Sequence, residues 1–175
     1  ELSSSLSGLT ELSKELSDYQ QDNPALTLAG EIHAMCPVIY GSEDLTWVAA
    51  LRLRGQLQEN AKMLAFHNSV PEQNHNEIEG WTCNPGILET KCIIWLKDES
   101  DHQRSKKRME ITSELLKNQA GKQFFISQSG SSKLLRLLKL IHFNDWVSYY
   151  CALFNKVNPS PVHRIMNLKQ LITDQ

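Results

Sequence analysis

A short apolar run in the middle of the chain, residues 91–96 (KCIIWL), places the strongest constraint on the fold. Both faces of a strand with this sequence are apolar, so the strand has to be covered on both sides, as in a parallel sheet. Residues 36–41, 64–67 and 123–126 are shorter runs of the same kind. The sequence therefore predicts a buried sheet to which these four runs contribute strands.

Helical patterns alternate with these strands, because apolar residues recur every three or four positions along the intervening stretches. The predicted helices cover residues 1–22, 25–34, 45–63, 101–118, 131–156 and 162–172. Strands that alternate with helices favour parallel pairing through right-handed crossovers, with helices on both faces of the sheet. We therefore predict an α/β fold, a three-layer αβα sandwich around a mainly parallel sheet.

Local sequence predicts several helix ends. Asn23 and Pro24 suit the start of the second helix, and residues 42–44 (Ser-Glu-Asp) are expected to cap the helix of residues 45–63. The residues expected to face inward on the helix of residues 101–118 are Met109, Ile111, Leu115 and Leu116. Residues 127–132 (SQSGSS) lead from a strand into a helix, where hydroxyl groups hold a phosphate in some proteins and simply cap the helix in others. We favour the cap.

Composition excludes several classes of function. The 175 residues suffice for about one domain with a real core, and a formal net charge of -2 gives no general attraction to nucleic acid or acidic membranes. The basic cluster at residues 104–108 fits an exposed helix face better than a polyanion site. No apolar run approaches the length that spans a membrane, and the N-terminus lacks the pattern of a signal peptide.

The cysteines point to a reducing compartment. Cys36, Cys83, Cys92 and Cys151 form no CxxC pair, so zinc-binding and thioredoxin-like motifs are absent. We expect free thiols that are buried or half-buried, in a cytoplasmic protein. The chain begins with Glu1 instead of Met, and we expect it to be part of a longer protein.

Polar residues crowd into two groups between residues 49 and 81. The first group comprises Gln56, Gln58, Glu59, Asn60 and Lys62, and the second is residues 74–77 (Asn-His-Asn-Glu). A solvated helix face and a surface turn would explain them, but acids, amides and an imidazole also gather in catalytic sites. A metal held by His67, His75 and Glu77 is conceivable on composition, yet their spacing matches no zinc pattern, and we expect no metal.

The same stretch resembles a known family. Residues 50–62 (ALRLRGQLQENAK) and 75–81 (HNEIEGW) are similar to the bifunctional phosphoglucose/phosphomannose isomerases, and the likeness extends over residues 24–175. The E-N-A-K and H-N-E-I-x-G-W motifs are specific in combination. Leu53, Arg54 and Asn158 depart from the usual family pattern, but none of them stands where proton transfer is expected.

The resemblance implies a sugar isomerase (SIS) domain, which has a flavodoxin-like fold. Family members carry two such domains, and this chain corresponds to the second: residues 1–22 would form a linker helix and residues 23–175 the C-terminal SIS domain. The first domain supplies the loop that grips the substrate phosphate. Because binding energy from that remote phosphate helps to position the reacting carbons, we expect the chain alone to have negligible turnover.

The resemblance also assigns roles to individual residues. Glu59 would be the base that moves a proton between C1 and C2 of a hexose 6-phosphate, through an enediol(ate). His75 would help to open the sugar ring, delivered from the neighbouring subunit of a homodimer, and Lys169 would assist from the other side. Residues expected to support them or to bind substrate are Arg52, Gln56, Asn76 and Glu77. Arg52 and Lys62 are candidate cationic neighbours of Glu59.

The resulting hypothesis is aldose–ketose isomerisation of glucose 6-phosphate, with mannose 6-phosphate as a further candidate substrate and no cofactor. Two alternatives remain at this stage. One is a non-catalytic SIS module that binds sugar phosphates or dimerises. The other is a nucleic-acid-binding domain, and only the basic cluster at residues 104–108 supports it.

Overall fold

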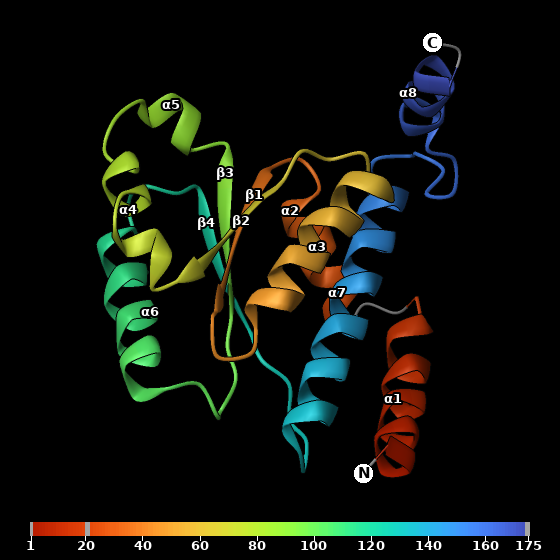
Figure 1. Cartoon of the computed structure of the whole chain (residues 1–175), viewed down its shortest axis with the longest axis horizontal. Coiled ribbons are helices and arrows are strands. Elements are labelled where there is room, and N and C mark those ends of the chain that lie inside the picture. Colours follow the sequence, from red (N-terminus) through yellow and green to blue (C-terminus); the bar gives the residue numbers. More distant parts are fainter. Residues whose placement is uncertain (1, 20–21, 174–175) are drawn as a thin grey trace.

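In the computed structural model, residues 2–19 and 22–173 are described, with side chains from residue 7 onward (Figure 1). The first half contains α1 (Leu2–Ser17), α2 (Pro24–Ile32), β1 (Cys36–Ser42), α3 (Trp47–Glu59), β2 (Phe66–Val70), the 3-10 helix η1 (Glu72–Asn74) and α4 (Glu77–Gly80). The second half contains α5 (Pro85–Leu88), β3 (Lys91–Leu96), α6 (Gln103–Leu115), β4 (Lys122–Ile126), α7 (Lys133–Phe154) and α8 (His163–Thr173). Residues 1 and 20–21 of the predicted first helix lie outside the described residues.

The sheet has the strand order β2-β1-β3-β4, and all neighbouring strands are parallel. Helices α2, α3 and α7 cover one face, and α6 with the short α4 covers the other (Figure 1). β3 occupies residues 91–96 as predicted, and five of its six residues are buried. The predicted three-layer α/β sandwich with a parallel sheet is therefore confirmed.

An apolar cluster fills each side of the sheet. The larger cluster joins the sheet to α1, α2, α3 and α7 and includes Leu16, Ile39, Leu53, Ile94 and Val147, all fully buried. The smaller cluster lies under α6 and is built around Tyr40, Trp81, Trp95 and Met109. Complete burial of one such side chain contributes about 1.5–3 kcal/mol, so the two clusters together hold the layers in place.

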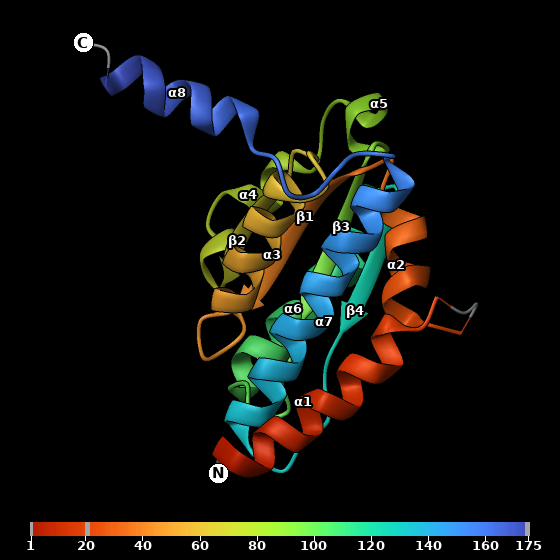
Figure 2. The ribbon, with the colours of Figure 1, turned by 90° about the vertical axis from the view of Figure 1, so that its right-hand side faces the viewer.

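Helix α1 is packed onto the domain along α7 (Figure 2). Its C-terminal end is fixed by Asn23, whose amide donates hydrogen bonds to the carbonyl of Leu16 (2.8 Å) and to the hydroxyl of Tyr150 (3.2 Å). The Asn23 side-chain oxygen accepts from the first turn of α2, which confirms the predicted cap. The division into a linker helix and a domain beginning at residue 23 remains a prediction.

Two predicted element boundaries are wrong. Helix α3 ends at Glu59, four residues before the predicted end, because Lys62 adopts a left-handed conformation (φ 59°) that a helix cannot contain. The strand predicted at residues 64–67 is β2, Phe66–Val70. Its position is set by pairing with β1, in which Val38 lies beside Phe66 and Ser42 beside Val70, and pairing of this kind leaves little trace in local sequence.

The predicted cap of α3 is also wrong. Thr46 precedes this helix, and its hydroxyl bonds to Ser42 N (2.7 Å) and to Leu96 O (3.0 Å) in place of the helix. The Asp44 carboxylate instead accepts hydrogen bonds from His102 N (2.9 Å) and the Ser105 hydroxyl (3.1 Å), at the start of α6. Asp44 therefore joins two loops that are distant in the sequence.

The inward face of α6 differs from the prediction. Met109 and Leu116 are buried as expected, but Ile111 is 50% and Leu115 63% exposed. Thr112 takes the inward position between them, where its hydroxyl accepts a hydrogen bond from the Asn74 side chain at 2.9 Å. The basic residues at 104–108 lie on the outer, solvated part of this helix as predicted.

All four cysteines are free thiols, but Cys83 is exposed, contrary to prediction. Cys36 is half-buried, and Cys92 and Cys151 are buried in the core. Burial raises the pKa of both buried thiols to about 12, so they behave as small apolar side chains. No helix among the described residues is long and apolar enough to cross a bilayer.

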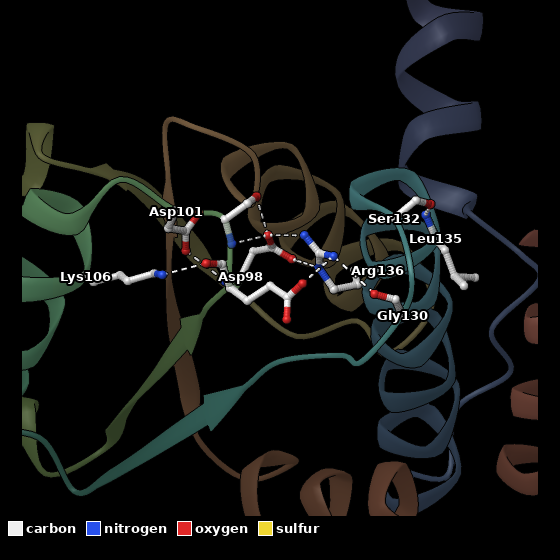
Figure 3. A network of polar contacts seen from close by, with 9 residues as sticks. Asp98, Asp101, Lys106, Gly130, Ser132, Leu135 and Arg136 are labelled. Carbon is white, nitrogen blue, oxygen red and sulfur yellow. Dashed lines mark hydrogen bonds and ion pairs between the residues drawn. The ribbon is translucent and has the colours of Figure 1, made fainter. Parts of the chain in front are cut away.

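A buried ion pair joins the loop after β3 to the first turn of α7 (Figure 3). The Arg136 guanidinium donates to both carboxylate oxygens of Asp98, at 2.7 and 3.0 Å, and to the carbonyl of Gly130 at 3.1 Å. Both charged side chains are about 95% buried. Glu99, which is exposed, approaches the same guanidinium at 2.7 Å.

Burial alone would raise the pKa of Asp98, but the hydrogen bonds from Arg136 and Ser100 outweigh it and lower the pKa to about 2. A carboxyl group with a lowered pKa in the folded state stabilises the fold above its unfolded pKa of about 3.9. That contribution is lost as the pH falls through about 2. The ion pair therefore contributes fully at neutral pH.

We predict that Arg136→Met lowers the free energy of unfolding by about 3–5 kcal/mol at pH 7, because Asp98 is left as an unpaired buried charge. Denaturant titration measures this loss. The deficit should shrink on acidification to pH 3, since protonation of Asp98 removes the uncompensated charge. Lys122→Met, which breaks an exposed ion pair with Glu31, is the control and should cost less than about 1 kcal/mol. A loss of similar size in both variants would contradict the assigned role of Arg136.

Candidate active site

Helix α3 carries three of the predicted site residues, Arg52, Gln56 and Glu59, spaced three or four positions apart and thus on one side of the helix. Arg52 forms a bidentate ion pair with Asp145 of α7, with N–O distances of 3.0 and 2.9 Å. The hydrogen bond to Asp145 raises the pKa of Arg52. Its guanidinium is therefore held by α7 and is not the cationic neighbour of Glu59.

A second polar link between α3 and α7 lies one turn further along. The Asn60 amide donates to Gln56 Oε1 (2.8 Å) and to the Ser148 hydroxyl (2.9 Å). The Ser148 hydroxyl in turn donates to the Asp145 carbonyl at 2.7 Å. The last turn of α3, which carries Glu59, is thus fixed against the middle of α7 on both sides of Gln56.

Glu59 is exposed at the edge of a groove with a volume of about 420 Å³. One wall of the groove is the end of α3 with Gln58, Glu59 and Lys62, and the other is formed by residues 161–165, which lead into α8. Lys62 donates to the backbone carbonyl of Glu59, not to its carboxylate. Among the described residues, the Glu59 carboxylate makes no ion pair.

His75 is not among the residues that line this groove. It lies at the end of η1, beyond the carboxyl end of β2. It is exposed, and its backbone N–H bonds to the Glu72 carbonyl at 3.0 Å. Asn76 follows it at the start of α4 and makes no side-chain cap bond. Over residues 2–19 and 22–173, no hydrogen bond joins His75 to Glu59 or to Lys169.

Glu77 anchors the segment that carries His75. Its carboxylate accepts hydrogen bonds from the Tyr40 hydroxyl (2.7 Å) and from the Asn68 amide (2.6 Å). The Trp81 indole donates to the same Tyr40 hydroxyl at 3.0 Å. Burial and the nearby Glu77 charge raise the pKa of Tyr40, which keeps it a hydrogen-bond donor. Glu77 therefore fixes the backbone beside His75 and makes no bond to the imidazole itself.

Lys169 lies on α8, which projects away from the rest of the chain (Figure 2). No residue of α8 is buried, and its apolar side chains Ile165, Leu168 and Ile172 are 40, 59 and 66% exposed. The structure of a single chain thus leaves Glu59, His75 and Lys169 apart.

The switch point of this sheet lies between β1 and β3, where a doubly wound fold commonly binds its ligand. The loops there carry the carboxylates of Asp44, Asp98 and Asp101. Arg136 is the buried cation of the region and is already paired with Asp98 and Glu99 (Figure 3). Asp101 is buried, which raises its pKa. The carboxylates at this edge are thus held by groups of the same domain, and Lys106 lies nearby, where it donates to the Glu99 carbonyl at 2.6 Å.

Ser132, in the Ser-Gly stretch before α7, caps that helix by accepting a hydrogen bond from Leu135 N at 3.1 Å. This confirms the cap that the sequence favours. Within the described part of the chain, no group of three or more His, Cys, Asp or Glu side chains is arranged to hold a metal ion.

Sequence reasoning missed two residues of the groove. His163 and Arg164 line it beside Glu59. His163 and Arg164 follow a proline-rich break, which gives no indication of what they face. The contacts of Asp145 and Ser148 with α3 depend on how two helices pack, which local sequence does not reveal.

Comparison with known proteins shows which class of domain this chain belongs to. Residues 21–172 match the family described as the bacterial phospho-glucose isomerase C-terminal SIS domain. Solved structures agree on the fold: a glucose-6-phosphate isomerase like protein from Thermus thermophilus superposes with a TM-score of 0.72 at 18% identity, covering 87% of this chain and 51% of that one. The C-terminal domain of a glucosamine-fructose-6-phosphate aminotransferase from Francisella tularensis gives 0.60 at 10% identity, covering 89% and 44%. The fold is that of a SIS domain.

Curated relatives narrow the class further. The bifunctional phosphoglucose/phosphomannose isomerase of Caldicellulosiruptor bescii is 37% identical over 155 residues, and that of Aquifex aeolicus 36% over 143 residues. These matches cover 89 and 82% of this chain. The chain belongs to the family of bacterial phosphoglucose isomerase C-terminal SIS domains. It spans about half the length of the relatives it matches, 46 and 44% respectively.

The environment of His67 provides a direct test of the site's electrostatics. Burial lowers the pKa of His67, the positive charge of Arg54 lowers it further, and the negative charge of Glu77 opposes both. Replacement of Arg54 by Met should therefore raise the pKa of His67, as followed by NMR titration of the imidazole protons. Arg104→Met, on the exposed side of α6, is the control and should leave it unchanged. A fall in the pKa after Arg54→Met would disprove the arrangement.

Proposed function

We propose that this chain is the C-terminal SIS domain of a phosphosugar isomerase that interconverts glucose 6-phosphate and fructose 6-phosphate, with Glu59 as the base. The observation that supports this most directly is the position of Glu59 on a groove of about 420 Å³, with a carboxylate that makes no ion pair among the described residues. A carboxylate of this kind can accept a proton from C2 and return it to C1 through an enediol(ate). Mannose 6-phosphate is the second substrate we propose, because it shares the same enediol(ate).

Rigid attachment of α3 supports the same role. A base that takes a proton from one carbon and returns it to the next needs a fixed position relative to both, and small displacements are costly. The last turn of α3 is held by the Arg52–Asp145 pair and by the Asn60–Ser148 hydrogen bond. Arg52 and Gln56 would thus act by positioning Glu59.

We propose that His75 acts in the site of a second subunit of a homodimer, where it opens the sugar ring. Imidazole is suited to proton transfer near neutral pH. His75 is exposed, while the adjacent Glu77 is fixed by Tyr40 and Asn68. An exposed imidazole beside a firmly held backbone suits delivery to another chain, and His75 is not among the residues that line the groove of Glu59 in its own chain. Asn76 would support the imidazole from the neighbouring position.

Lys169 would complete the site from the opposite side of the sugar. This role requires α8 to be held against another surface of the whole protein, which agrees with the exposed apolar side chains of Ile165, Leu168 and Ile172. The substrate phosphate would be bound by an upstream SIS domain, as the family resemblance implies. The 175-residue chain alone would then have negligible turnover.

In the full-length protein, Glu59→Gln should reduce kcat for isomerisation of glucose 6-phosphate by at least about 10²-fold, since an amide cannot take up the proton. A coupled assay for fructose 6-phosphate measures the rate. Glu114→Gln, an exposed glutamate on α6, is the matched control and should retain full activity. If the Glu59→Gln variant kept a rate near normal, Glu59 would not be the catalytic base. A wild-type protein that binds hexose phosphate without turnover would favour a non-catalytic SIS module.

Shared sites between subunits can be tested by mixing two inactive variants. A purified mixed dimer of Glu59→Gln and His75→Asn chains contains one site with both natural residues if the two come from different subunits. It should regain about half of the wild-type activity, whereas each variant alone stays inactive. If both residues act within one chain, every site contains one substituted residue, and the mixed dimer should show no recovery of activity.

A further inference from the structure

The side chain of Lys62 reaches across the groove and binds its opposite wall. Its ammonium donates to the carbonyls of Pro161 (2.8 Å) and Pro159 (3.3 Å), and to the carbonyl of Glu59 at the end of α3. The three hydrogens of an ammonium group can satisfy three acceptors that converge from different directions. Lys62 thus connects the helix that carries Glu59 to the segment that leads into α8.

The backbone at Lys62 has the left-handed conformation that commonly ends a helix, and Met63 N donates to the Leu57 carbonyl at 3.1 Å around it. Lys62 has a φ of 59°, a left-handed conformation that non-glycine residues rarely adopt. The conformation ends α3 and turns the side chain back across the last turn of that helix. Glycine would adopt it more easily but would offer no ammonium.

The connecting segment, residues 155–162, is otherwise held at its beginning only. There, Asn155 donates to the Ala61 carbonyl at 3.2 Å and Val157 N donates to Ala152 O at 3.0 Å. Beyond this point Pro159 and Pro161 have no backbone N–H, and the Ser160 N–H is bound within the segment by Asn158. Over the described residues, Lys62 supplies the hydrogen bonds that attach the second half of the segment to the domain.

We propose that Lys62 is a positioning residue, which clamps residues 159–161 to the end of α3 and thereby sets the wall of the groove opposite Glu59 and the direction of α8. This inference rests on the proposed function, in which Glu59 and Lys169 act on one substrate. Lys62 does not touch the substrate in this proposal. It fixes the distance between two elements that do.

The test uses the full-length protein and the variant Lys62→Met, which keeps the length and the β-carbon of the side chain but removes the ammonium. Lys156→Met is the matched control. Lys156 lies in the same segment, also has a left-handed φ of 55°, and its ammonium makes no hydrogen bond within the described part of the chain. Backbone strain is therefore the same in each substitution.

Hydrogen exchange tests the clamp without reference to activity. Lys62→Met should accelerate exchange by at least about 10-fold at the amides of Ser160 and Met166, which are hydrogen-bonded to Asn158 and to the Val162 carbonyl. It should leave residues 155–157 unchanged, because these are held by α7. Lys156→Met should match the wild type. Unchanged exchange at Ser160 and Met166 in Lys62→Met would overturn the clamp, whether or not the protein is an isomerase.

Kinetics then test the positioning role. Lys62→Met should lower kcat about 10-fold or more for hexose 6-phosphate, with a much smaller change in KM, because the reacting groups are misplaced while phosphate binding persists. A clamp with no catalytic role would accelerate exchange and leave kcat unchanged, and this result would overturn the positioning role. If the wild-type protein has no isomerase activity, the proposed function fails, and the exchange experiment still decides the clamp.

Discussion

The need to cover both faces of β1 and β3 governs the structure. These central strands are buried almost completely, and an apolar strand of this kind is stable only between two layers of helices. Parallel pairing then requires helical crossovers, which place α3 and α7 side by side on one face and α6 on the other. The part of the candidate site around Glu59 follows from this arrangement, since Glu59, Lys62 and Asp145 all lie on or beside α3 and α7.

Polar interactions differ between the two ends of the domain. At the carboxyl ends of the strands, the exposed carboxylate of Asp44 and the buried one of Asp98 bind guanidinium, hydroxyl and backbone N–H groups of neighbouring loops. At the opposite end of α3, an ammonium binds carbonyl groups and leaves the carboxylate of Glu59 unpaired beside a groove. Acids thus join neighbouring loops at one end of the domain, and at the other end the Glu59 carboxylate makes no ion pair among the described residues.

Much of the fold could be predicted because the strongest signals are local. The strand at residues 91–96, the cap at Asn23 and the alternation of strands and helices all depend on the chemistry of adjacent residues. Predictions failed where a distant partner decided the outcome. Asp44 binds the start of α6 instead of capping α3, and Thr112, whose hydroxyl meets the Asn74 side chain, takes the inner position predicted for Ile111. None of these partners is adjacent in the sequence.

The sequence by itself determined the class of fold, the family and the segments that carry Glu59, His75 and Lys169, because hydrophobic period and motif spacing are properties of short stretches. Only the tertiary structure decided what surrounds each of them: a groove beside Glu59, an anchor formed by Tyr40 and Asn68 beside His75, and an exposed helix under Lys169. The physical reason is that hydrogen bonds and ion pairs form between whatever groups packing brings within about 3 Å, and packing joins residues from all parts of the chain.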